Sequence, residues 1–282
     1  MSRFAIALSV LVLAASGAAG QARAMVDEKD VAKLVSIGGS CSRCELSGKK
    51  LVGARFMGAN FGSAVMVGSD LRGSSFMGSN FDRADFTKAD LRGASMMGAN
   101  FGSAVFVHAM LDGVEGAGSN FQRADMTGAQ MNGAELPAAN FYGATLVKAK
   151  LVGAELPGAN LSRVEAAYAD FHDAELNGAN LTHGNFTKAS FRNAELNAAA
   201  LGRAEFAGAD FRGAELKHAN IAGVDLSHVR GLTQDQVDEA CGDGSTRLPA
   251  GLVAKACRGR VIVVHGAPKP PKPPKPPKPP RD

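Results

Sequence analysis

Large aromatic side chains are scarce in this sequence. Its 282 residues include no tryptophan and only two tyrosines, whereas 34 are glycine. A thick globular core is normally filled by large apolar and aromatic side chains, so this composition argues against one. Long apolar runs are missing beyond the N-terminus, and no later segment of the sequence is suited to crossing a membrane.

The body of the chain, residues 25–265, carries no excess of positive or negative charge. The formal net charge is +4, but two basic residues, Arg3 and Arg23, precede the body and five follow it in residues 266–282. Between them lie 24 basic and 26 acidic residues, which is almost neutral. We therefore expect no basic face for nucleic acid on the body.

Catalytic motifs are absent as well. The sequence shows no Walker loop, nucleophile elbow, glycine-rich dinucleotide motif or credible Ser–His–Asp arrangement. The six histidines fall at scattered positions, which disfavours a histidine metal site. We predict a protein that is not an enzyme and needs no cofactor. The histidines are His108, His172, His183, His218, His228 and His265.

The N-terminus has the pattern of a secretory leader. Arg3 precedes an apolar run that ends at Ala15, and Ala22 and Ala24 form an A-x-A site. This order is typical of a signal peptide, here residues 1–24, and the run is too short to span a bilayer. We expect cleavage after Ala24 and a soluble bacterial protein that is periplasmic or secreted.

A five-residue repeat dominates the chain beyond this leader. In ADFTKADLRGAS, residues 84–95, the large residues Phe86 and Leu91 recur at a spacing of five. A helix places apolar residues every 3.6 positions and a strand every two, so neither alone has this period. A backbone that turns four corners per circuit points each large residue inward and stacks equivalent positions about 4.8 Å apart. The repeat predicts an all-β, four-sided solenoid with inward positions from Leu46 to Leu226.

The pattern A-(D/N)-(L/F)-x-x resembles that of the pentapeptide-repeat family and covers about two thirds of the chain. The resemblance implies a right-handed quadrilateral β-helix. We expect the solenoid over residues 40–230, with short helical caps at both ends. The N-terminal capping helix is expected over 25–39, the C-terminal cap over 231–265, and a Lys/Pro-rich tail over 266–282.

Several local features fit such coils. Glycine recurs at two of the four corners, and Pro157-Gly158 suits the centre of a type II turn. Where the inward residue is reduced to Gly116, its small neighbour is enlarged to Val114, as close packing demands. A column of asparagines can bond along the rod through side-chain amides. These are Asn60, Asn80, Asn100, Asn120, Asn140, Asn160 and Asn180.

Both ends of the solenoid need a cap, because an open end exposes unpaired strand edges. At the C-terminal end, Thr233 and Gln236 have the spacing of a capping box, and Leu232 and Val237 are placed for a hydrophobic staple. At the N-terminal end, three apolar residues have helical spacing. They are Val31, Leu34 and Val35.

The four cysteines lie only at these two ends. In an exported protein an even number favours disulfides, and we predict the pairs Cys241–Cys257 and Cys41–Cys44. The C-x-x-C spacing of the second pair also occurs in redox and zinc sites. No thioredoxin-like pattern or second ligand pair accompanies it, so a structural role is favoured.

The tail is cationic and rich in proline. Its basic residues recur every three positions, and polyproline II has three residues per turn, so they line one edge of an extended segment. Such an arm suits an anionic surface or a partner protein, while a solubilising spacer explains it equally well. The basic residues are Lys269, Lys272, Lys275, Lys278 and Arg281.

An acidic column runs along the predicted rod. Around its first three members, Glu115, Glu135 and Glu155, no basic residue is expected, so this part could take a cation or a basic partner. A solvated acidic stripe is the simpler interpretation. The remaining members are Glu175, Glu195 and Glu215, and the residues expected to compensate them are His172, Arg192, Arg212 and Lys217.

Methionines form a second outward column, at Met57, Met77 and Met97. Thioethers can bind a soft metal such as Cu(I), although the filling of an exposed corner is the simpler interpretation.

These features favour a non-enzymatic exported scaffold for interaction with a protein or an anionic surface, with a cationic arm. A homodimer through the C-terminal cap is compatible with them. The family resemblance raises an alternative, a DNA-mimicking protein that binds a topoisomerase. Such a mimic should be strongly acidic along its length and cytoplasmic, and this chain is neither. The third hypothesis is a rod that binds cations or copper through the Glu or Met column.

Overall fold

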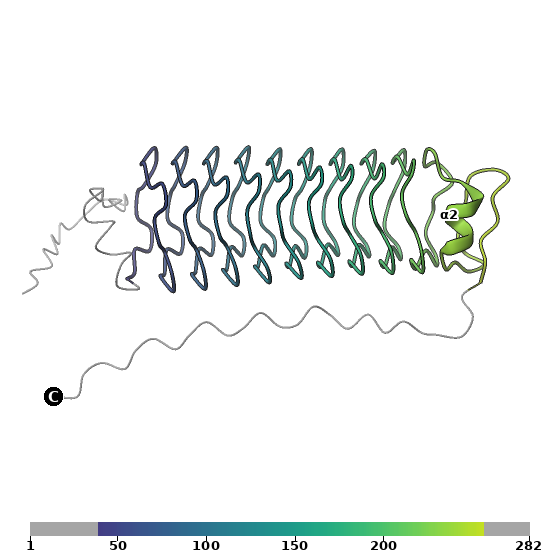
Figure 1. The fold of residues 1–282 in the computed structure, drawn as a ribbon, viewed down its shortest axis with the longest axis horizontal. Coiled ribbons are helices and arrows are strands. Elements are labelled where there is room, and N and C mark those ends of the chain that lie inside the picture. The colour runs from purple at the N-terminus through teal and green to yellow at the C-terminus, as the bar shows by residue number, and fades with distance from the viewer. Residues whose placement is uncertain (1–38, 257–282) are drawn as a thin grey trace, which may run out of the picture.

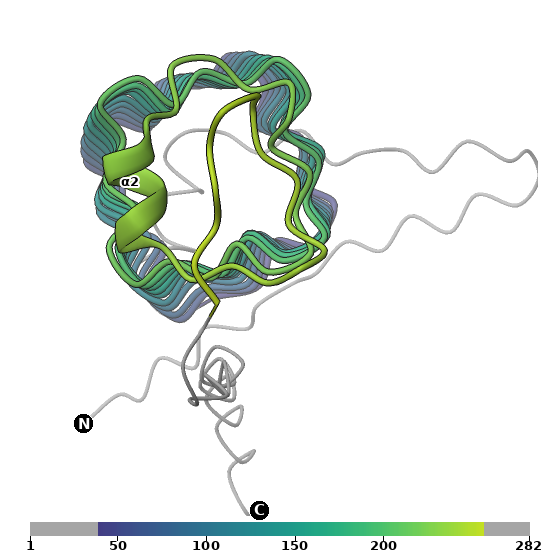
Figure 2. The same ribbon diagram turned by 90° about the vertical axis from the view of Figure 1, so that its right-hand side faces the viewer.

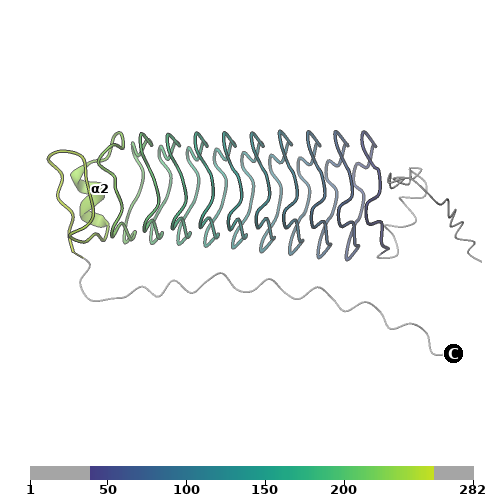
Figure 3. The same ribbon diagram turned by 180° about the vertical axis from the view of Figure 1, so that it is seen from behind.

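The structure, a computed structural model, describes residues 39–256 of the chain. These residues form a rod of stacked coils that ends in a short helix, α2 (Gln234–Glu239) (Figure 1). Viewed along the rod, the coils outline a four-sided cross-section (Figure 2). Seen from behind, each coil follows the course of its neighbour along the whole stack (Figure 3).

Parallel bridges hold successive coils together. The bridged partners are twenty residues apart, from Ser40 with Asn60 to Asp210 with Arg230, and each side of a coil carries one bridge. Within residues 39–256 these bridges stay isolated and do not lengthen into strands, because the chain turns a corner after each one. The prediction of a four-sided solenoid with a twenty-residue circuit is confirmed.

Backbone hydrogen bonds run in both directions along the rod. The amide of Asn80 donates to the carbonyl of Ala59 in the preceding coil at 2.9 Å, and that of Phe81 to Asn100 in the next coil at 2.7 Å. The amide of Ala84 closes the corner by donating to Phe81 at 3.0 Å. This scheme satisfies polar backbone groups that the tight coil would otherwise bury without partners.

The corners use left-handed backbone conformations more widely than the glycine pattern predicts. Gly158 has φ +65°, as expected for Pro157-Gly158. However, eighteen non-glycine residues within 39–256 also have positive φ, among them Ala138 (+54°) and Tyr168 (+62°). All four corners therefore have a residue in the left-handed conformation, and glycine lowers the conformational cost at some of them.

The core is a set of stacked inward columns. Phe86 is completely buried and stacks on Phe106 of the next coil, with ring centroids 4.9 Å apart, which confirms its inward position. At Gly116 the missing side chain is replaced from the neighbouring coil. A Cβ placed there would lie 2.7 Å from Cδ2 of Leu136, so Leu136 fills this space in addition to the buried Val114.

Helix α2 covers part of the C-terminal end of the rod, and the segment after it crosses that end (Figure 2). The expected capping box is present: Thr233 accepts from the Gln236 amide, and the Gln236 side chain accepts from the Thr233 amide. The Gln236 Nε2 also donates to the carbonyls of Phe211 and Ala214 at 2.9 and 2.6 Å, which ties α2 to the last coils. Val237 is buried and Leu232 packs against the core.

The predicted signal peptide 1–24 and tail 266–282 lie outside the described residues, as does all but Gly39 of the predicted helix 25–39. In the part of the chain that the structure describes, no helix has the length and hydropathy required to span a bilayer.

Candidate functional site

Within residues 39–256, no three or more His, Cys, Asp or Glu side chains are grouped so that they could hold a metal ion. Five of the six histidines are described and they do not cluster; His172 lies beside its sequence neighbour Asp173, with Nε2 3.1 Å from the carboxylate. A shallow depression of about 360 Å³ lies near the N-terminal end and is lined by small and polar residues that include Ser42, Arg43 and Asp82. The candidate sites are therefore the outward columns of the rod.

The asparagine column forms a side-chain ladder. Asn80 Nδ2 donates to Asn60 Oδ1 at 2.9 Å, and the same contact recurs at each step up to Asn160 and Asn140 at 3.1 Å. The ladder does not extend to Asn180, because the Asn160 Oδ1 accepts the amide and hydroxyl of Ser162 instead. These amides bond to one another and to the backbone, so we assign the column a structural role.

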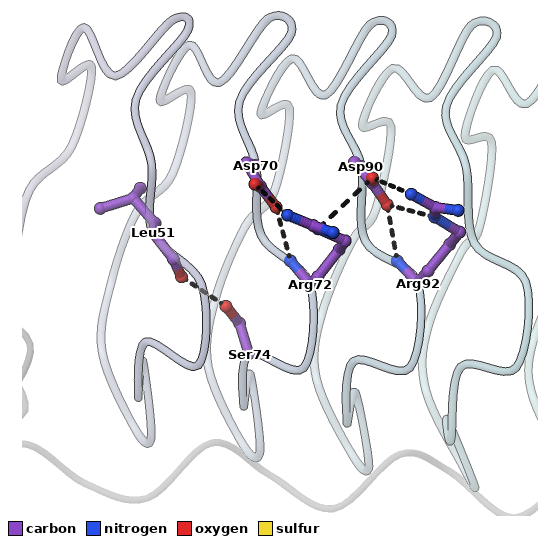
Figure 4. Close-up of polar contacts among 6 residues, drawn as sticks. All are labelled: Leu51, Asp70, Arg72, Ser74, Asp90 and Arg92. Atoms are coloured by element: carbon purple, nitrogen blue, oxygen red, sulfur yellow. Dashed lines mark hydrogen bonds and ion pairs between the residues drawn. The ribbon is translucent and has the colours of Figure 1, made fainter.

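Another side of the rod carries bidentate pairs of Asp and Arg, here named Asp–Arg clamps, which were not anticipated from the sequence. Arg72 donates to both carboxylate oxygens of Asp70 at 2.8 and 2.7 Å, and Arg92 holds Asp90 in the same way at 2.9 and 2.7 Å (Figure 4). Arg72 Nε also lies 3.7 Å from Asp90, which links the two coils. Hydrogen bonding to the arginine lowers the pKa of each aspartate below its ordinary value. The spacing Asp-x-Arg, which recurs at Asp210, was the signal in the sequence.

Just below these clamps, the buried Ser74 hydroxyl donates to the carbonyl of Leu51 in the preceding coil at 2.8 Å (Figure 4). Together with the clamps, this contact shows that polar side chains here stabilise the stacking of coils and are not free for a ligand.

The acidic column is continuous, and its members bridge in successive coils from Glu115 to Glu215. Its last two members, Glu195 and Glu215, are compensated by amides and not by the cations that the sequence suggested. Asn177 Nδ2 donates to Glu195 at 2.7 Å, and Asn197 Nδ2 to Glu215 at 2.9 Å. Of the expected cations, Arg212 is held by Asp210 and His172 by Asp173.

The first part of the acidic column has no such compensation. Asn177 and Asn197 each contact the glutamate eighteen residues later. The corresponding residues before Glu115, Glu135 and Glu155 carry no amide donor; they are Met97, Ala117 and Pro137. Within the described residues, no cation or side-chain amide contacts the exposed carboxylates of Glu115, Glu135 and Glu155. We name the side that carries Glu115, Glu135 and Glu155, with the Ala117–Pro137–Pro157 corner at its edge, the open acidic face.

The methionine column occupies the same corner nearer the N-terminus. Met57 and Met97 are exposed by 51% and 37%, and Met77 is half-buried between them. The column therefore presents thioethers at the surface, one coil apart.

Cys41 and Cys44 are joined by a disulfide at the first coil, with Cα atoms 5.4 Å apart. Cys241 is disulfide-bonded too, but its expected partner Cys257 lies outside the described residues, as do His265 and the basic residues of the tail.

The fold agrees with a family defined by its repeat. The model of the pentapeptide repeats matches the chain in 8 copies that span residues 40–136 and 139–230. The chain belongs to the pentapeptide-repeat family. A comparison with curated protein sequences gives no match.

Three solved structures illustrate the similarity. HetL, a pentapeptide repeat protein involved in heterocyst differentiation regulation from the cyanobacterium Nostoc, is 26% identical; the match covers 64% of this chain and 88% of HetL, with a TM-score of 0.46. QnrB1, a plasmid-mediated fluoroquinolone resistance protein, is 21% identical over 71% of this chain and 91% of its own, with a TM-score of 0.38. Rfr23 from the cyanobacterium Cyanothece is 20% identical over 66% and 93%, with a TM-score of 0.17. These scores are low, and the family assignment rests on the repeat model.

Proposed function

We propose that this protein is a non-enzymatic scaffold of the bacterial periplasm or exterior, whose rod presents fixed side-chain columns to a binding partner. The observation that carries the proposal is the division of the outer surface. The Asn ladder and the Asp–Arg clamps bond within the rod, whereas the open acidic face leaves three carboxylates without partners among the described residues. Family membership supports the right-handed sense of the solenoid, and the leader-like N-terminus supports export.

The alternative of DNA mimicry is less well supported. A mimic needs free negative charge along its length, but Asp70, Asp90 and Asp210 are neutralised by arginines two residues later. The free carboxylates of the open acidic face are confined to one side of the rod. QnrB1 is a fluoroquinolone resistance protein. We do not assign that role to this chain on the basis of its similarity to QnrB1.

A pull-down from periplasmic extract tests the scaffold. The mature chain should retain a specific protein, and deletion of residues 266–282 shows whether the arm or the rod binds it. Glu135→Gln with Glu155→Gln should release a partner held by the open acidic face. The matched control is Glu165→Gln with Glu205→Gln, which removes two exposed carboxylates from a different side. Loss of the partner in both double variants alike would contradict binding through this face.

A further inference from the structure

The open acidic face and the Lys/Pro-rich tail have matching periods. Glutamates of the face lie one coil apart, about 4.8 Å, so every second glutamate recurs at about 9.6 Å. In polyproline II, three residues advance about 9.3 Å, and this is the distance between successive basic residues of the tail. The two spacings differ by about 0.3 Å per repeat, which flexible lysine side chains absorb easily.

The match includes apolar surface as well as charge. Each lysine of the tail is followed by two prolines, so an extended tail has one cationic edge and two proline edges. The face has the same division, with the glutamate column beside the Ala117–Pro137–Pro157 corner. An amide column would offer hydrogen bonds to a tail of this kind, but only carboxylates attract its lysines electrostatically.

The tail can reach the face from where the described chain ends. Ala256 bridges to Gly242 at the C-terminal end of the rod, and Glu215 lies in one of the last coils before α2. The twelve residues 257–268 can span up to about 40 Å when extended, which exceeds the distance of a few coils. Five coil spacings from Glu215 to Glu115 cover about 24 Å. Residues 269–281 would cover about 37 Å as polyproline II, so the column has room for about three of the five basic residues at once.

We propose that the C-terminal Lys/Pro-rich tail docks along the open acidic face of its own chain. The tail runs back along the rod, and successive lysines lie between pairs of stacked glutamates, one lysine for every two coils. This goes beyond the scaffold proposal, because both surfaces belong to one molecule. An external partner for either surface then competes with the docked tail.

Zero-length carbodiimide cross-linking of the full mature chain tests the proposal, since it joins lysine amines to carboxylates only in direct contact. Monomeric product should contain links from Lys269, Lys272, Lys275 or Lys278 to glutamates of the column. In Glu135→Gln with Glu155→Gln, the total yield of tail-to-rod links should fall at least about fivefold, because the contacts act together. The control pair Glu165→Gln with Glu205→Gln should leave the yield unchanged. Unchanged melting temperatures will show that each variant is folded.

A variant with altered lysine spacing distinguishes docking in register from a non-specific attraction between opposite charges. Lys272→Pro with Pro273→Lys keeps the composition of the tail but breaks its three-residue period. Docking in register predicts that the yield of links to the column falls about threefold or more. The proposal is overturned if the yield is unaffected by this variant, if links spread over all sides of the rod, or if they occur only between molecules in dimeric product.

Discussion

Single residues at the corners adopt a backbone conformation that L-amino acids disfavour. Gly118 and Ala138 occupy the same corner of adjacent coils, with φ +62° and +54°. No atom lies within 4 Å of the Cβ that Gly118 lacks, so backbone conformation alone decides the effect of adding it. We predict that Gly118→Ala lowers and Ala138→Gly raises the free energy of unfolding, each by about 1 kcal/mol. Urea denaturation measures both, and changes of the same sign would contradict this account of the corners.

Asp243 makes the C-terminal end of the rod sensitive to acid. Its carboxylate accepts from the Ser245 hydroxyl and amide at 2.7 and 2.9 Å and from the Gly223 amide at 3.1 Å. These bonds lower the pKa of Asp243 from 3.8 to about 2, with the Ser245 hydroxyl the largest cause. Since the folded state favours the ionised form, the stabilisation is complete above the unfolded pKa and is lost as the pH falls towards about 2.

Thermal melting of wild type and Asp243→Asn across this range tests the effect. An asparagine oxygen accepts the same bonds but does not titrate, so the wild type should lose stability relative to the variant as the pH falls from about 5 to 2. A constant difference over the same range would show that Asp243 has the same pKa in the folded and unfolded chain.

At the scale of the element, the Gln236 side chain is one of the contacts that fix α2 to the coils. Gln236→Glu keeps the acceptor of the capping box but replaces the amide that donates to Phe211 and Ala214. We predict a loss of about 1–3 kcal/mol in the free energy of unfolding, because the Phe211 and Ala214 carbonyls both lose the Gln236 donor and face a carboxylate. Asp235→Asn, an exposed change one position earlier, should have little effect. Equal stability of the Gln236 variant and the wild type would mean that the Gln236 amide does not help to hold α2 on the coils.

The coils could be predicted from sequence because a solenoid places each inward residue by its period alone. Phe86 is inward for the same reason as every fifth residue before and after it. The corner conformation at Tyr168 was not predictable from glycine content, because the fold imposes it on any residue at that place. The compensation of Glu195 was missed for a related reason. A search for opposite charge overlooks the amide of Asn177, which is eighteen residues away in sequence but one coil away in space.

At the scale of the whole molecule, export should be detectable as a cleaved N-terminus and as oxidised cysteines. We predict that mass spectrometry of protein recovered from the periplasm shows an N-terminus at Met25 and no free thiol at Cys241 or Cys257. The A-x-A site and the even cysteine count motivate this expectation. Intact residues 1–24, or free thiols at both cysteines, would argue against export and against the C-terminal disulfide.

The scaffold depends on a rigid rod in which residues twenty apart are stacked, and a single distance tests this most directly. Lys88 and Lys188 are exposed corner residues of one column, five coils apart, and both have φ +58° without being glycine. Spin labels on Lys88→Cys and Lys188→Cys should give one narrow distance distribution by double electron–electron resonance. Its centre should lie near five coil spacings, about 24 Å, within the few Å that the labels add. A broad distribution, or a mean far beyond that length, would contradict the stacked coil and the fixed columns on which the proposed function rests.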